Sequence, residues 1–319
     1  MGNYTVQELD AIRVAYETML SDIHATVNDE KQLALVEAAY RYCLEKYDGK
    51  YLNSGKAYML HLIEMARIAV VEMGLGYISV VGAFLHGITY KNEVSINEIE
   101  QKFGKTVAIV MEGFDKLSDL QNENISYHSE DFRVLFLSLI DDMRAVLLKI
   151  AHRVYDVRNQ DDIEKARLAR YFNEIKFIYI PIVHRLGLYK IKAELEDKLM
   201  RFEHPDMYDE IERKLQATQE IRQQTMDKFL EPIVKALDSE AENKKKTGKC
   251  RFSYSIKWRQ KSIASIYAKM KAKNVPFEEV YDILAARVII RCALKDEQEC
   301  CWGVYSVVTN LYEPNPERL

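Results

Sequence analysis

The sequence predicts a multidomain fold, in which an all-α N-terminal part is followed by an incomplete α+β domain. Glycine and proline are scarce, with 12 and 6 among 319 residues, and helical periodicity dominates the first 240 residues. Near residue 240 the pattern changes to the alternation typical of a strand. A helical stretch, a β-branched run and another helical stretch follow, so the C-terminal part has the order strand, helix, strand, helix.

Four apolar stretches define the helices expected in the N-terminal part. One runs from about residue 57 and ends near Gly74, and the next, from about 78 to 86, is almost wholly apolar. An all-apolar helix belongs at the centre of a bundle, where every face is covered. The stretches 131–152 and 175–188 are also apolar, and Pro181 interrupts the second. We therefore expect about 200 residues of helices joined by short loops.

The C-terminal elements follow a polar, basic segment, 241–249, which we predict to be a loop. Apolar and polar residues then alternate with a period of two, as in a strand with one covered face. The apolar positions of this strand are Cys250, Phe252, Tyr254, Ile256 and Trp258. A helix is expected over about 260–273, a buried strand over 287–291 and a final helix over about 296–312.

Composition narrows the class of protein. The net charge is only -4, and the N-terminus lacks the basic and apolar segments of a signal peptide. No apolar run reaches the roughly 18 residues needed for a membrane helix, so we expect no membrane partner and a cytoplasmic location.

The segment 243–277 differs from the acidic chain around it, because it contains eleven basic residues and no Asp or Glu. Such an excess indicates an anionic partner, either nucleotide phosphates or nucleic acid. Lys261, Ser265 and Lys269 are spaced four apart on one helical face, near a predicted helix N-terminus. That arrangement suits a polyphosphate, although a solvated lysine face has the same spacing. Asp282, before the next strand, could hold Mg²⁺ or form a cap or salt bridge.

The stretch 257–290, KWRQKSIASIYAKMKAKNVPFEEVYDILAARVII, resembles the opening of the synthetase domain of the RelA/SpoT family. The family pattern is close to GRxKxxxSIYxKM followed by YDLLAxRVI. Trp258 replaces the glycine, and the matching positions are Arg259, Lys261, Ser265, Lys269, Met270, Asp282 and Arg287. The resemblance implies a nucleotidyltransferase-like synthetase domain over 216–319, which the chain contains only in part.

This resemblance also implies a reaction, the transfer of pyrophosphate from ATP to the 3′-hydroxyl of GDP or GTP in the stringent response. Arg259 is expected to stack on adenine, and Asp282 to bind catalytic Mg²⁺. The ATP phosphates are expected to contact Lys261, Ser265 and Lys269. The family's guanine-binding NGYQSLH segment and catalytic glutamate would follow Leu319, so we expect no alarmone synthesis from these 319 residues alone.

Two further resemblances cover the helical part. Residues 178–208, with HRLG and IKAELED, are similar to the family's linker bundle, which we place at 166–215. We place a degenerate HD-type hydrolase domain at 1–165, where the resemblance begins at about residue 40; in this family His, His-Asp and a distant Asp of that domain bind Mn²⁺. His61 and His86 are retained, but Gly87 and His152 stand at the two metal-binding aspartates.

Other positions of that hydrolase pattern have changed as well. Tyr90 and Lys91 replace the water-activating Glu-Asp pair, and Leu52 and Asn53 replace the guanosine-binding Arg-Lys pair. Because Mn²⁺ is a hard cation that prefers carboxylate oxygen, we expect the Mn²⁺ site and the hydrolase activity to be lost. We expect the three histidines to be packed core residues, with a zinc site as the alternative.

The leading hypothesis is a monofunctional GTP pyrophosphokinase with a degenerate hydrolase domain. The alternatives are a bifunctional synthetase/hydrolase, a regulatory domain that binds the alarmone without turnover, and RNA binding through the basic segment. The resemblance implies ATP and GDP or GTP as partners. It also makes a homo-oligomer a possibility to test, together with ribosome or tRNA contacts through C-terminal regions outside this chain.

Overall fold

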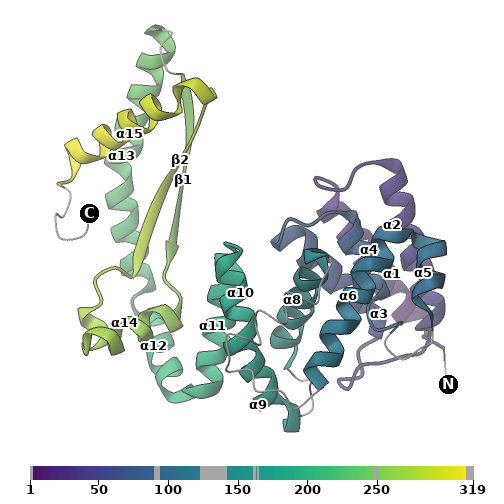
Figure 1. Cartoon of the computed structure of the whole chain (residues 1–319). Helices are drawn as coiled ribbons and strands as arrows, with labels where there is room; N and C mark the ends of the chain where they lie inside the picture. The colour runs from purple at the N-terminus through teal and green to yellow at the C-terminus, as the bar shows by residue number, and fades with distance from the viewer. Residues whose placement is uncertain are drawn as a thin grey trace. The chain divides into compact units, whose positions relative to one another are not determined.

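The computed structural model describes residues 3–89, 94–122, 142–160, 163, 165–247 and 251–313. The chain divides into two compact units, Met1–Phe202 and Glu203–Leu319, and each is described by itself (Figure 1). None of the helices in the described ranges combines the length and apolar character needed to cross a membrane.

The regular secondary structure in the described part of unit 1 is helical, apart from an isolated β-bridge between Tyr51 and Ala57. Its elements are α1 (Val6–Ile23), α2 (Glu30–Lys46), α3 (Tyr58–Arg67), η1 (Ile68–Glu72), α4 (Tyr77–Leu85), α5 (Ile96–Phe103), α6 (Lys105–Asn122), α8 (Met143–Arg158), α9 (Lys165–Glu174), η3 (Ile175–Tyr179), α10 (Ile180–Arg185) and α11 (Tyr189–Glu203). Here η1 and η3 are single π-helical turns that continue α3 and precede α10.

Helix α4 lies at the centre of unit 1, as its apolar sequence predicts. Every residue from Ile78 to Leu85 is buried, and α4 contacts α2, α3, α6 and α8. The closest approach is at Gly82, where a Cβ atom would lie 2.6 Å from Cδ1 of Leu148 on α8. The missing side chain therefore allows α8 to pack directly against α4.

The other predicted helices of unit 1 are found with small changes. The stretch 57–74 forms α3 and η1 and ends at Gly74, whose positive φ of 72° suits glycine. Pro181 does not break its stretch, because it occupies the first turn of α10, where no helical N–H is needed. Residues 131–141 of the stretch 131–152 lie outside the described residues, and α8 begins after Asp142, which caps its N-terminus.

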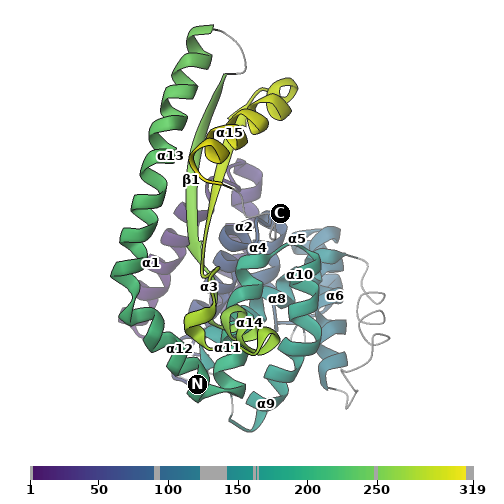
Figure 2. The same cartoon turned by 90° about the vertical axis from the view of Figure 1, so that its left-hand side faces the viewer.

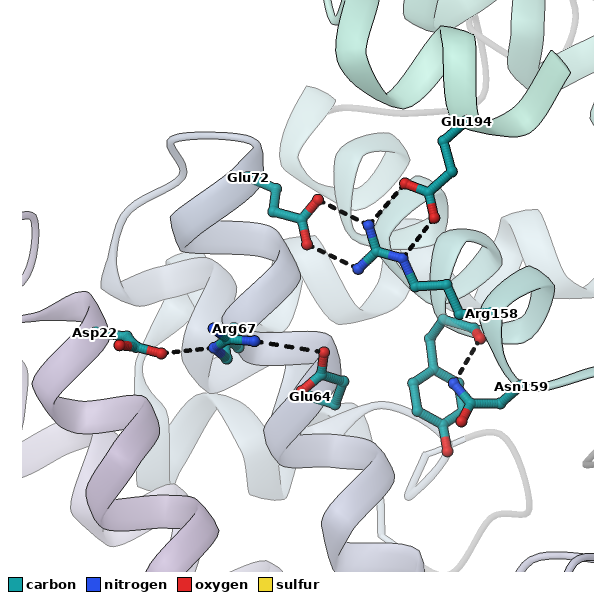
Figure 3. A network of polar contacts seen from close by, with 8 residues as sticks. Asp22, Glu64, Arg67, Glu72, Arg158, Asn159 and Glu194 are labelled. Carbon is teal, nitrogen blue, oxygen red and sulfur yellow. Dashed lines mark hydrogen bonds and ion pairs between the residues drawn. The ribbon is translucent and has the colours of Figure 1, made fainter. Parts of the chain in front are cut away.

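Helix α11 is joined to the rest of unit 1 by a network of ion pairs around Arg158 (Figure 3). The Arg158 guanidinium bridges two carboxylates, with Nη1–Oε1 2.7 Å to Glu72 and Nε–Oε1 2.7 Å to Glu194. Three elements, η1, α8 and α11, therefore meet at one side chain. Phe202 on α11 also stacks on Phe172 of α9, with ring centroids 4.2 Å apart.

Unit 2 contains helices and a small sheet. Its elements are α12 (Pro205–Ala217), α13 (Gln219–Thr247), β1 (Phe252–Gln260), α14 (Ile263–Lys273), η4 (Phe277–Glu279), β2 (Leu284–Cys292), η5 (Leu294–Asp296) and α15 (Glu297–Leu311). The predicted order strand, helix, strand, helix is confirmed by β1, α14, β2 and α15.

The two strands pair antiparallel, from Phe252 opposite Cys292 to Gln260 opposite Leu284. One face of this pair is covered by α13 and α15, as Figures 1 and 2 show. The core of unit 2 contains Phe252, Tyr254, Ile256, Val288 and Ile290 from the strands with Ile233, Leu237 and Val304 from the helices. The predicted alternation of β1 is confirmed at Phe252, Tyr254 and Ile256, which face the covering helices. It is wrong at Trp258, which is 37% exposed near the end of the strand, and Cys250 lies outside the described residues.

Two predictions for this region were wrong. The expected loop over 241–249 is helical as far as Thr247, because α13 continues through its polar lysine-rich end. The strand β2 was expected to be buried, but Val288, Ile289 and Ile290 are only half-buried. In the described part of the sheet, helices cover one face of two strands, which cannot bury both faces of β2.

Candidate functional sites

Three histidines from distant parts of the sequence meet inside unit 1, and we call them the histidine triad. His61 lies on α3, His86 caps the C-terminus of α4 and His152 lies on α8. One potential ligand atom from each lies within 4.8 Å of the others. The Nε2 atoms of His61 and His86 are 3.3 Å apart. The sequence predicted each of these residues, and the packing of the three helices brings them together.

Aromatic side chains enclose the triad. The ring of Tyr155 lies 4.2 Å from that of His61, and Phe114 lies 5.6 Å from His86, measured between centroids. Tyr58 lies 5.4 Å from His61. Our sequence analysis missed these residues, although Tyr58 and Tyr155 each stand three positions from a triad histidine and so share its helical face.

Burial keeps the triad uncharged. His61 and His86 are 2% and 4% exposed, whereas His152 is half-buried. Desolvation lowers the pKa of His61 to about 3 and holds the pKa values of His86 and His152 well below their ordinary value. Within the described part of the chain, the Nδ1 atom of each ring is buried without a hydrogen-bond partner. Neutral imidazoles with free lone pairs are the form that binds metal ions.

A pocket of about 340 Å³ opens beside the triad. It is lined by Leu52, Asn53, Tyr58, His61, His152, Tyr155, Asp156, Ile163, Arg167 and Tyr171. Leu52 and Asn53, which stand where the hydrolase pattern has a basic pair, therefore border this pocket. Aromatic rings, one acidic and one basic side chain remain in its wall, so it can still accept a small polar ligand.

The triad does not fit Mn²⁺. Over the described ranges, the cluster of convergent ligand atoms consists of three histidine nitrogens and includes no carboxylate. Asp156 approaches only one member, with Oδ1 3.7 Å from Nε2 of His152. At the position of the metal-binding aspartate that follows His86 in the hydrolase pattern, this chain has Gly87. Its φ is 77°, and a Cβ there would lie 3.2 Å from the Tyr58 hydroxyl. Residues 90 and 91 lie outside the described residues.

A second candidate site lies where the two strands of unit 2 meet the loops beyond their last pair. There Asp282 forms ion pairs with Lys261 and Lys269 through the same oxygen, Oδ2, and we call these residues the Lys–Asp cluster. The Lys261–Asp282 distance is 2.7 Å. The Lys261 backbone N–H donates to the Ile283 carbonyl at 2.7 Å, which extends the strand pairing by one bond. That bond places Lys261 and Asp282 side by side.

The N-terminus of α14 adjoins the Lys–Asp cluster. Ser262 caps this helix, because its hydroxyl accepts a hydrogen bond from the Ser265 N–H. The Ser262 hydroxyl also donates a hydrogen bond to the Ser265 hydroxyl at 2.8 Å. Helix N-termini attract anions through unpaired N–H groups and the helix dipole. Lys269 is two turns further along the same helix. Arg259 lies exposed on β1 opposite Ala285.

The charged groups of the Lys–Asp cluster shift the pKa values of one another. The two lysines hold the pKa of Asp282 well below its usual range, chiefly through their hydrogen bonds. Desolvation is the main cause of the lowered pKa of Lys261, and the hydrogen bond to the Asp282 carboxylate acts in the opposite direction by raising that pKa. Two ammonium groups and one carboxylate give a local charge of +1. The cluster can therefore bind phosphate oxygens through the lysines and a divalent cation through Asp282.

Comparisons with known protein families match two regions of this chain, and each region contains one of the candidate sites. An HD domain matches residues 39–189, and the region found in RelA/SpoT proteins matches residues 258–319. The chain belongs to the RelA/SpoT family. The histidine triad thus lies in the HD domain and the Lys–Asp cluster in the RelA/SpoT region.

RelA/SpoT relatives of this chain include enzymes named for synthesis and hydrolysis. The bifunctional (p)ppGpp synthase/hydrolase SpoT of Escherichia coli K12 is 30% identical over 301 residues, which cover 94% of this chain and 41% of that protein. The guanosine-3′,5′-bis(diphosphate) 3′-pyrophosphohydrolases of Spiroplasma citri and Aquifex aeolicus are 28% and 27% identical, over 94% and 88% of this chain and 38% of each relative. The chain spans about two fifths of the length of these relatives.

Proposed function

We propose that the protein containing this chain is a (p)ppGpp synthetase, which transfers pyrophosphate from ATP to the 3′-hydroxyl of GDP or GTP. In this proposal its HD domain no longer hydrolyses the alarmone. The Lys–Asp cluster is the observation that supports the transferase function most directly, because it combines phosphate-binding cations with a metal-binding carboxylate.

The chemistry of pyrophosphate transfer explains why such a cluster is useful. Negative charge is spread over the phosphate oxygens as the transferred group moves, so fixed cations lower the barrier. Lys261 and Lys269 would contact the ATP phosphates, with Ser265 at the N-terminus of α14 as a further donor. Asp282 would then exchange its lysine partners for Mg²⁺, which neutralises the phosphates from the other side. Arg259, exposed on the neighbouring strand, would stack on adenine.

The proposed loss of hydrolysis is supported by the composition of the triad. Hydrolysis by an HD-type site needs a hydrated metal ion and a carboxylate that activates the water. The described triad supplies nitrogen ligands alone, and the aspartate position beside His86 is Gly87.

The test uses a polypeptide of the relatives' length that contains these 319 residues, as wild type and as Asp282→Asn. We expect the wild type to form alarmone from labelled ATP and GDP or GTP, and the variant to lose activity by roughly 100-fold or more. Glu278→Gln, a change at an exposed carboxylate near Asp282 in sequence, is the matched control. Wild-type activity that survives Asp282→Asn unchanged would contradict the assignment of the site.

Hydrolysis is the second candidate, because several relatives are named as pyrophosphohydrolases. The pocket beside the triad also leaves a third function, binding of the alarmone without turnover. The same protein incubated with labelled alarmone and Mn²⁺ separates them. Release of pyrophosphate would favour the second candidate, and saturable binding with intact ligand would favour the third.

A further inference from the structure

We infer that the histidine triad is a binding site for a borderline divalent cation of the zinc class, in place of the Mn²⁺ site expected of an HD domain. Each of three helices supplies one imidazole to this site. The inference is independent of the transferase proposal, because it concerns the metal alone.

The spacing of the nitrogens is the first argument. Two nitrogens bound to one tetrahedral zinc ion, each about 2.0–2.1 Å from it, lie about 3.3–3.4 Å apart. The Nε2 atoms of His61 and His86 are 3.3 Å apart. A ligand atom of His152 lies within 4.8 Å of both, so a modest rotation of its ring completes a three-nitrogen set.

The surroundings of the rings are the second argument. In the part of unit 1 that the structure describes, the only hydrogen bond between triad rings joins Nε2 of His61 to Nε2 of His86, and the three Nδ1 atoms are buried without partners. Buried polar atoms are usually paired, and unpaired ones call for a ligand, an ion or a water. A cation between the two Nε2 atoms would replace this single contact, and the ring that donates its proton there would carry that proton on Nδ1 instead.

The donor type selects the metal. Imidazole suits zinc, copper and nickel, whereas manganese and magnesium prefer carboxylate and water oxygen. His61 and His152 also line the pocket beside the triad. A three-histidine site that faces a pocket keeps a fourth position for water or an anion, which is the pattern of an open zinc site.

Nearby charges limit the affinity. Among the described residues, positive groups that act on the triad include Lys56, Lys149 and Arg153, and Asp156 is a negative group beside His152. Arg153 is already paired with Glu174 and Asp156, at 2.5 Å and 3.2 Å. Asp156, 3.7 Å from His152, is the carboxylate best placed to orient that ring as metal-bound histidines usually require.

Metal analysis of the intact chain tests the inference. After exposure to Zn²⁺ and dialysis, we expect about one zinc per chain by elemental analysis. His61→Ala, His86→Ala and His152→Ala should each weaken zinc binding by roughly 100-fold. His24→Ala, a change at an exposed histidine of unit 1, should leave it unchanged. Zinc that stays bound equally in all four variants, or no zinc in the wild type, overturns the inference.

A second measurement covers the case in which a triad variant does not fold. In the wild-type chain, X-ray absorption at the zinc edge should show nitrogen neighbours at about 2.0–2.1 Å and no sulfur shell. Mn²⁺ should not compete with zinc at equal concentration. Sulfur neighbours, or displacement of zinc by Mn²⁺, overturns the inference. Alarmone hydrolysis by the zinc-loaded chain would instead refute the proposed loss of hydrolase activity and leave the metal site standing.

Discussion

At the scale of single residues, the two candidate sites differ in how their charges are balanced. The triad is neutral and depends on burial, whereas the Lys–Asp cluster is half-exposed and holds three charges within direct contact. Each lysine of the cluster is paired with Asp282, at the point where the proposed function places a phosphate. The two ammonium groups therefore meet at the Asp282 carboxylate from different elements, Lys261 from the end of β1 and Lys269 from α14.

This arrangement predicts a sharp difference between neighbouring lysines of α14. In a protein of the relatives' length, Lys269→Met should lower alarmone synthesis by roughly 100-fold, because a cation beside the moving phosphates is lost. Lys271→Met should change it by less than about twofold, since Lys271 is exposed and lies over the Tyr267 ring instead. Initial rates with labelled ATP measure both, and equal effects would show that α14 binds phosphate without this geometry.

At the scale of elements, the close contact of α4 with α8 depends on Gly82. In Gly82→Ala the added Cβ would lie 2.6 Å from Leu148 Cδ1 inside the buried core. The variant should lose about 1–3 kcal/mol of stability through overpacking. Urea unfolding followed by far-UV circular dichroism measures the change.

The matched control is Gly303→Ala on α15, where a Cβ meets nothing within 4 Å. Because alanine favours a helix over glycine, this variant should gain about 0.5–1 kcal/mol. Fluorescence of the adjacent Trp302 reports unfolding of unit 2. A Gly82→Ala protein as stable as the wild type would show that α8 moves away at little cost.

The ion pairs of Arg158 connect α8 with η1 and α11, and their partial burial makes them stronger than surface pairs. Arg158→Met leaves Glu72 and Glu194 facing each other without a cation, so unit 1 should lose about 2–4 kcal/mol. Arg13→Met should cost much less than Arg158→Met, because Arg13 is 58% exposed beside Asp10 and Glu17 and solvent screens its ion pairs. Thermal unfolding at neutral pH compares the two, and similar losses would contradict the assigned role.

At the scale of the whole molecule, the ion pair between Arg158 and Glu72 makes the stability of the fold depend on pH. The Arg158 hydrogen bonds lower the pKa of Glu72 from its ordinary value of 4.5. A depressed carboxyl pKa stabilises the folded state above that ordinary value, and the contribution is lost as pH falls through the folded pKa. The stability gap between wild type and Arg158→Met should therefore be full at pH 7 and should narrow as the pH falls below 4.5. A gap that stays constant over this range would contradict the linkage.

Much of the architecture follows from sequence pattern alone. Helical periodicity predicted α4, α15 and the combined span of α3 and η1 to within about two residues, and alternation predicted β1, because both patterns record which side of an element meets the core. The residue types also indicated both regions: lysines and an aspartate for phosphate and metal, and histidines without carboxylates for a lost Mn²⁺ site, with zinc as the alternative. The loop predicted over 241–249 failed because polarity marks exposure, and an exposed helix end such as that of α13 is equally polar.

Tertiary structure alone decided which of those residues meet. His61, His86 and His152 lie on three helices separated by 25 and 66 residues, and only the packing around Gly82 brings α4 and α8 close enough to join them. Lys261 and Asp282 are adjacent because the strand register places them just beyond its last pair. The sequence determined the chemical groups and the local elements, whereas distances between groups far apart in the chain depend on long-range packing, which no local pattern encodes.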